Sequence, residues 1–284
     1  PHRTVRRIVR GMPASDGAGV KLTRVIGTPQ LEMLDPFLML DEFGTDRPED
    51  YLAGFPDHPH RGFETVTYML DGHMQHQDHL GNTGDLGPGG VQWMTAAHGI
   101  IHSEMPQQTE GRMRGFQLWI NLPGVEKMKP AGYRDIPAAE IPVVTLEQGG
   151  EARVIAGRLT IGETRIAGPV NSDGAMATDP LYVDLRLPAG AHFETSVTPG
   201  HNAFIYLYEG EARVGGHNLP HRAAGLLTDG DGLRISAGDS GASMLLLAAR
   251  PLREPVVQYG PFVMNTREEI EQALADYRDG RLAN

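Results

Sequence analysis

The sequence contains no cysteine among its 284 residues. This absence excludes disulfide bonds, zinc sites built on thiolates and cysteine nucleophiles in one step. Any metal that the chain binds must therefore be held by nitrogen and oxygen atoms. The 12 histidines and 36 acidic residues are the side chains that can supply those atoms.

Long apolar runs are also missing. No stretch approaches the roughly 20 apolar residues needed to span a bilayer, and the N-terminus has no apolar segment of the secretory kind. Residues 1–11 are basic and acid-free, as in transit peptides, but the alternation of Val5, Ile8 and Val9 suits an opening strand, which we favour. We therefore expect no membrane segment and a cytoplasmic location.

Basic residues are fewer than acidic ones. The chain has 25 Lys and Arg against 36 Asp and Glu, a formal net charge of −11. Such a balance argues against bulk attraction to nucleic acid or to an anionic membrane. We expect small molecules or proteins as partners, with no direct contact to nucleic acid.

Glycine and proline are abundant instead. The 36 glycines and 21 prolines make up about a fifth of the chain, and the 40% of hydrophobic residues exclude disorder as the main state. Short strand-like runs bounded by Gly, Pro, Asn or Asp are typical of β-sandwiches and barrels. They lie at 64–70, 116–122, 181–187, 203–208 and 244–249.

Local motifs predict turns and one helix. Asp71-Gly72 and Glu209-Gly210 each follow an apolar strand and indicate hairpin turns. Near the end, Thr266 and Glu269 form a capping box that precedes apolar residues at helical spacing. We expect a final amphipathic helix of about three turns there.

The two halves of the chain have similar patterns of strands and acidic glycine turns. Prolines and glycines interrupt residues 127–151, which places a domain boundary near residue 145. We therefore expect two tandem β-barrels, residues 1–145 and residues 146–284, with the helix ending the second.

Histidines are concentrated in the first half, where seven of the twelve fall between residues 58 and 102. On an extended strand, His58-x-His60 places both imidazoles on one face, and His102-x-Glu104 does the same for its pair. If two such strands lie across a barrel, four ligands converge on a divalent metal. An octahedral iron or manganese ion would keep two positions open for water, dioxygen or substrate.

Other residues of this region have less specific roles. Glu64 shares the parity of His60, so spacing alone leaves the choice between Glu64 and Glu104 as the carboxylate ligand open. Phe63 and Trp93 are expected in the core or a pocket wall, and His98 in the second shell or at the mouth of the site. Three further histidines are expected to be solvated or at the rim, namely His73, His76 and His79.

At these residues the sequence resembles the cupin superfamily and, more narrowly, the pirin family. The similarity is carried by the run from His58 to Tyr68, by the Gln92-Trp93-Met94-Thr95-Ala96 and Gly99-Ile100-Ile101-His102-Ser103-Glu104 segments, and by the segment from Gly260 to Thr266. The resemblance implies two cupin barrels of the jelly-roll type. It also implies metal ligation by His58, His60, His102 and Glu104, with Glu64 in the second shell or pocket, and a C-terminal cupin without ligands.

The resemblance implies one divalent metal, which we expect to be Fe²⁺, although Mn, Ni, Cu or Zn also suit nitrogen and oxygen ligands. Several members of the family resemble quercetin 2,3-dioxygenases, whereas others resemble transcriptional cofactors or enzyme regulators. Our leading hypothesis is a dioxygenase of a flavonol-like or enol-bearing aromatic substrate, in which Glu104 is the catalytic base. The alternative is a metal-dependent regulator that acts on a protein partner.

Overall fold

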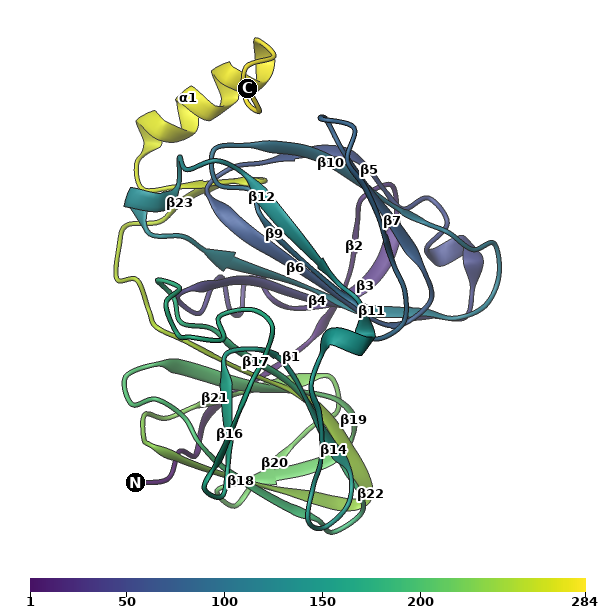
Figure 1. The fold of residues 1–284 in the computed structure, drawn as a ribbon, viewed down its shortest axis with the longest axis vertical. Coiled ribbons are helices and arrows are strands. Elements are labelled where there is room, and N and C mark those ends of the chain that lie inside the picture. The colour runs from purple at the N-terminus through teal and green to yellow at the C-terminus, as the bar shows by residue number, and fades with distance from the viewer. The chain divides into compact units, whose positions relative to one another are not determined.

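A computed structural model describes residues 1–284, whose regular secondary structure is mainly β-strand (Figure 1). This confirms the all-β prediction. The chain forms two compact units. The N-terminal unit comprises Pro13–Thr28, Glu32–Ala138 and Leu252–Asn284, and the C-terminal unit comprises Pro1–Met12, Pro29–Leu31 and Ala139–Pro251. Both chain ends thus belong to the unit formed mainly by the other half, and the boundary near residue 145 stays a prediction.

The N-terminal unit contains two larger sheets. A seven-stranded sheet has the order β12-β9-β6-β11-β4-β3-β2. Its strands are β2 (Met12–Asp16), β3 (Val20–Ile26), β4 (Phe37–Thr45), β6 (Phe63–Asp71), β9 (Val91–Thr95), β11 (Met113–Asn121) and β12 (Gly132–Ile136).

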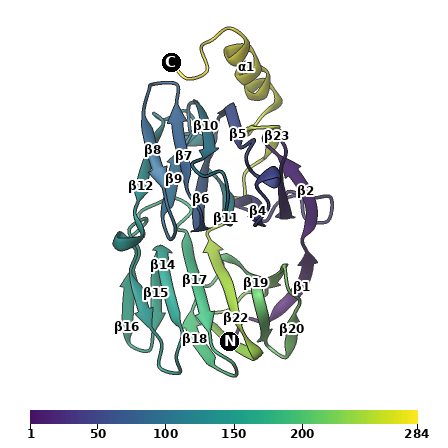
Figure 2. The same ribbon diagram turned by 90° about the vertical axis from the view of Figure 1, so that its right-hand side faces the viewer.

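The second sheet of this unit has the order β5-β10-β7-β8, and Figure 2 shows these four strands in that sequence. They are β5 (Phe55–His60), β7 (Met74–Asp78), β8 (Thr83–Leu86) and β10 (Ile100–Pro106). The unit also contains a small hairpin of β23 (Val257–Tyr259) and β24 (Phe262–Met264). Two 3₁₀ turns lie in its loops, η1 (Pro48–Asp50) and η2 (Gly124–Glu126).

The C-terminal unit is built on a nine-stranded sheet. Its main path is β1-β21-β19-β22-β17-β14-β13, with β18 on β22 and β20 on β19, beside a separate β15-β16 hairpin and the 3₁₀ turn η3 (Ala138–Glu140). The strands are β1 (Val5–Arg10), β13 (Val143–Thr145), β14 (Glu151–Ala156), β15 (Arg158–Ile161), β16 (Thr164–Ala167), β17 (Leu181–Leu187), β18 (His192–Ser196), β19 (Asn202–Val214), β20 (His217–Leu219), β21 (Ala223–Leu227) and β22 (Gly232–Ala249).

These strands confirm the runs predicted from the sequence, including the opening strand. β1 carries Val5 and Val9, both buried, and pairs with β21. In the C-terminal unit the inward positions are apolar, as Val183, Leu185 and Leu187 of β17 illustrate, so its interior is a hydrophobic core. The N-terminal unit has several smaller apolar clusters, one of them around Met69 and Met113.

The predicted helix is confirmed as α1 (Arg267–Arg278). The Thr266 hydroxyl accepts the backbone N–H of Glu269 at 3.2 Å, which satisfies one of the free donors of the first turn. Ile270 and Ala273 are buried in a cluster with Phe262 and Met264. No helix of the chain is long and apolar enough to cross a membrane.

The two glycine turns differ from the expected hairpins. Asp71-Gly72 connects β6 to β7, but these strands pair with other partners, β6 in the large sheet and β7 in the small one. Glu209-Gly210 is not a turn, because β19 continues through it with shifts of register on both sides. An acidic glycine dipeptide also suits a β-bulge, which inserts a residue without ending the strand.

The C-terminal segment is anchored by two buried cations of the N-terminal unit. Arg61 donates from Nη1 to Asp276 of α1 at 2.8 Å and from Nη2 to the Leu282 carbonyl at 3.1 Å. Lys127 is fully buried, and its Nζ donates to the carbonyls of Gly62 and Val263.

The Lys127 amine has a third acceptor, the Asn121 side-chain oxygen, at 2.6 Å. Burial lowers the pKa of Lys127 to about 8, so the amine remains largely protonated at neutral pH. Its three donors then match three acceptors, which compensates for removing the charge from water.

Substitution of Gly210 by alanine tests the bulge assigned to β19. Gly210 has a φ of +79°, and a Cβ there would lie 2.1 Å from the Gly241 carbonyl oxygen, whereas Gly200, with a φ of +84°, has nothing within 4 Å. Both Gly→Ala changes cost about 1–2 kcal/mol of backbone strain, and the clash adds about 1–3 kcal/mol only in Gly210→Ala. Urea unfolding of the two variants measures the difference, and equal losses would contradict the assigned bulge.

Substitution of Lys127 tests whether its buried amine anchors the C-terminal segment. We expect Lys127→Met to lower the free energy of unfolding by about 2 kcal/mol, because it removes the Lys127 donor from the buried carbonyls of Gly62 and Val263. Lys129→Met is the matched control, since Lys129 is 39% exposed and pairs only with Glu126 through its amine, an interaction worth about 0.5 kcal/mol. Urea unfolding that gives the same loss in both variants would show that the buried amine is not an anchor.

Candidate metal centre

Two neighbouring strands of the four-stranded sheet bring the predicted histidines together. β5 and β10 are antiparallel, with His58 opposite His102 and His60 opposite Ile100. The candidate ligand atoms of His58, His60 and His102 all lie within 4.8 Å of one another. The two pairs thus lie on adjacent strands of one sheet and not, as expected, on strands across a barrel.

A register shift in this ladder sets the direction of the side chains. His102 is opposite His58, but Glu104 is opposite Phe55, so β5 has one extra residue between the two pairs. Such a bulge re-aims neighbouring side chains. At this point the Nδ1 of His58 lies 2.7 Å from the Pro56 carbonyl oxygen. Because a carbonyl only accepts, Nδ1 carries the proton and the Nε2 lone pair of His58 is available.

The other two imidazoles are buried and point at each other. The Nε2 atoms of His60 and His102 are 3.1 Å apart, and both side chains are nearly inaccessible to water. Burial lowers the pKa of each well below the ordinary histidine value, and the neighbouring histidines lower it further. Both rings are therefore neutral, which is the state that binds metals.

Glu104 lies beside this group. Its Oε1 is 3.7 Å from Nε2 of His102, and its Oε2 is 3.2 Å from the Thr67 hydroxyl, for whose single proton it competes with the Gln117 side-chain oxygen at 2.5 Å. Burial raises the pKa of Glu104, while its electrostatic interaction with His58 and its contact with Thr67 oppose the shift. A nearby cation would stabilise the charged form of this carboxylate.

Glu64, the other candidate carboxylate, has different neighbours. It alternates along β6 with Thr65 and Thr67, so it lies on the opposite face from the residue that contacts Glu104. Its carboxylate accepts hydrogen bonds from Trp93 Nε1 at 3.2 Å and from the Thr95 hydroxyl at 2.5 Å. Burial raises the pKa of Glu64. Trp93 thus positions the Glu64 carboxylate through a hydrogen bond.

Aromatic rings flank the histidines on one side. Phe63 lies 5.3 Å from the ring of His60, and Trp119 of β11 lies 5.5 Å from it, centre to centre. The two rings also contact each other at 4.5 Å. Phe63 was expected as core or wall. Trp119 was not predicted, although its alternation with Gln117 along β11 places it on the face of Thr67.

His76 is the main residue that sequence reasoning misplaced. It was expected to be solvated, but only 3% of it is exposed, and its Nδ1 lies 3.1 Å from the Nδ1 of His102. It is directly opposite Glu104 in the ladder of β7 and β10. Met74 and His76 are two residues apart and therefore share one face of β7. The apolar side chain of Met74 could have indicated that this face points inward.

The remaining histidines of this region lie outside the three-histidine group. His98 is half-buried, and its backbone carbonyl accepts a hydrogen bond from Arg61 Nε. His79 is exposed, as expected, and its Nε2 lies 3.1 Å from the Ala283 carbonyl. His98 therefore contacts Arg61, which anchors the C-terminal segment, and His79 contacts that segment directly.

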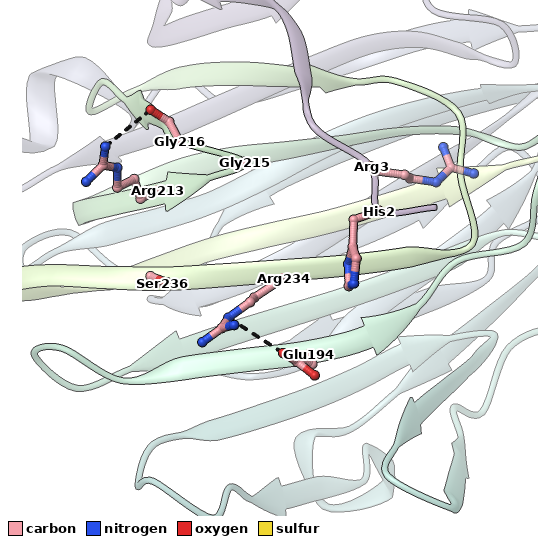
Figure 3. A pocket seen from close by; sticks show the side chains of 8 residues that line it. All are labelled: His2, Arg3, Glu194, Arg213, Gly215, Gly216, Arg234 and Ser236. Atoms are coloured by element: carbon pink, nitrogen blue, oxygen red, sulfur yellow. Dashed lines mark hydrogen bonds and ion pairs between the residues drawn. The ribbon is translucent and has the colours of Figure 1, made fainter.

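The C-terminal unit has a pocket of its own, of about 360 Å³, shown in Figure 3. Arg213 and Arg234 contribute to its wall, but Arg234 is paired with Glu194 and the Arg3 side chain turns toward backbone carbonyls such as that of Thr198. Among its lining residues are one histidine, His2, and one carboxylate. The pocket therefore does not present a set of converging metal ligands.

Comparison with known proteins agrees with this architecture. A provisionally named quercetin 2,3-dioxygenase of Pseudomonas aeruginosa is 58% identical over 99% of both chains. Human pirin is 43% identical over 94% of this chain and 89% of its own. The crystal structure of a quercetin 2,3-dioxygenase from Acinetobacter baumannii matches with a TM-score of 0.90 and 31% identity over 100% of this chain and 99% of that one.

These matches confirm the expected fold of two cupin domains. The sequence matches the Pirin family over residues 19–120 and the Pirin C-terminal cupin domain over residues 182–283. The first match includes His58, His60, His102 and Glu104, and the second includes α1. The chain therefore belongs to the pirin family.

Proposed function

We propose that this protein is a metal-dependent dioxygenase that acts on a flavonol-like or enol-bearing aromatic compound such as quercetin. The observation that carries the proposal is the group of three imidazoles within 4.8 Å, with the Glu104 carboxylate beside it. The relatives named as quercetin 2,3-dioxygenases support the choice of substrate and reaction.

The residues fit a divalent metal in the proposed role. The Nε2 atoms of His60 and His102 face each other at 3.1 Å, close enough for both to ligate one ion. His58, His60, His102 and Glu104 would supply three nitrogens and one oxygen. We propose Fe²⁺ as the ion, and Mn, Ni, Cu or Zn would suit the same atoms.

When bound, the ion would act as a Lewis acid on a substrate hydroxyl and supply the redox chemistry for dioxygen. The carboxylate of Glu104 would accept the proton of that hydroxyl through the oxygen that does not ligate the ion. The rings of Phe63 and Trp119 would form an apolar wall against an aromatic substrate and exclude water from His60.

A second candidate function is regulation through a protein partner. Arg61, next to His60 in the chain, is bonded to Asp276 of the surface helix α1, so this contact links the metal-binding strand to an exposed element. Under this alternative, a partner from the native cytoplasm would be retained by the metal-loaded protein and released by the metal-free protein. Turnover of an aromatic substrate would then be incidental.

Oxygen uptake tests the dioxygenase. After anaerobic reconstitution with Fe²⁺, we expect the wild-type protein to consume oxygen only when quercetin is added. His102→Ala removes one imidazole and should reduce uptake to that of metal-free protein. His73→Ala, an exposed histidine of the same unit, should retain it. Uptake that is absent in the wild type, or equal in His102→Ala, would refute the proposal.

A further inference from the structure

His76 has no assigned role, yet it is enclosed within the metal centre. Its ring lies 5.0 Å from that of His102 and 5.0 Å from that of Tyr133. Directly opposite partners of a β-ladder place their side chains on the same face, so His76 shares the face of Glu104. It is not one of the three clustered imidazoles, and it contacts the cluster through His102.

The contact between these two rings restricts where protons can lie. The Nδ1 atoms of His76 and His102 are 3.1 Å apart, a hydrogen-bond distance, so one of them must donate and the other accept. If His76 donates, a neutral His102 carries its proton on Nε2, and that atom cannot bind a metal. If His102 donates, its Nε2 has a free lone pair directed at His60.

We propose that His76 is a positioning residue of the metal centre. Its Nδ1 accepts the Nδ1 proton of His102, which holds the His102 ring in the tautomer and orientation that present Nε2 to the ion. The proposal rests on the metal site proposed above but not on the dioxygenase reaction. It predicts two protonated nitrogens in the metal-loaded protein, Nδ1 of His102 and Nε2 of His76.

The surroundings of His76 are consistent with this arrangement. Its Nε2 is buried and has no hydrogen-bond partner, so neither tautomer is favoured by a bond at that end of the ring. The ring cannot easily turn away, because Tyr133 packs against it and only 3% of it is exposed.

Zinc affinity of two His76 variants tests the role without any turnover. Competition with a chelator should show about 10–100-fold weaker Zn²⁺ binding in His76→Leu, which removes the acceptor and keeps an apolar side chain of similar size. His76→Asn places its side-chain oxygen near the position of Nδ1 and should restore affinity to within a few-fold of wild type. His73→Leu, on an exposed histidine, should bind as wild type does.

A spectroscopic measurement on the wild-type protein supplies a readout that a merely structural residue would not affect. Long-range ¹H–¹⁵N spectra of the Zn²⁺-loaded protein should assign the His102 proton to Nδ1 and the His76 proton to Nε2. A proton on Nδ1 of His76, or unchanged affinity in His76→Leu, would overturn the role of His76 alone. Failure of the wild-type protein to bind Zn²⁺ would overturn the metal site itself and this role with it.

Discussion

The pairing of β5 with β10 is the constraint on which the metal centre depends. It sets His58 against His102 and, together with the bulge next to Pro56, directs three imidazoles to one point. Backbone hydrogen bonds hold these strands, so the donor atoms are brought together before any ligand contributes. Three imidazoles and a carboxylate in so small a volume offer a nitrogen and oxygen donor set of the kind that divalent cations bind.

The elements that surround this pairing support it from two sides. Phe63 and Trp119 cover His60, while His76 and Tyr133 cover His102. Behind the ligand strand, Arg61 and Lys127 join the residues that follow His60 to the C-terminal segment. The end of the chain is thus part of the unit that contains the three-histidine group, although the linear sequence places it beyond the second barrel.

Much of this arrangement could be predicted from the sequence, because the motifs are local. Alternation alone shows that His-x-His and His-x-Glu each place two side chains on one face, and the capping box marks the start of α1. The partner of each strand is not encoded locally. For this reason β5 and β10 were expected across a barrel, His76 was expected in solvent, and the bulge at Gly210 was taken for a hairpin.

The most direct measurement is X-ray absorption spectroscopy at the iron edge of the Fe²⁺-loaded protein. The account predicts a first shell of nitrogen and oxygen only, with multiple-scattering features from three imidazoles and at least one carboxylate oxygen. Loss of one imidazole in His58→Ala would identify a member of the set. A first shell with one imidazole or none would contradict the convergence of His58, His60 and His102 on a single ion.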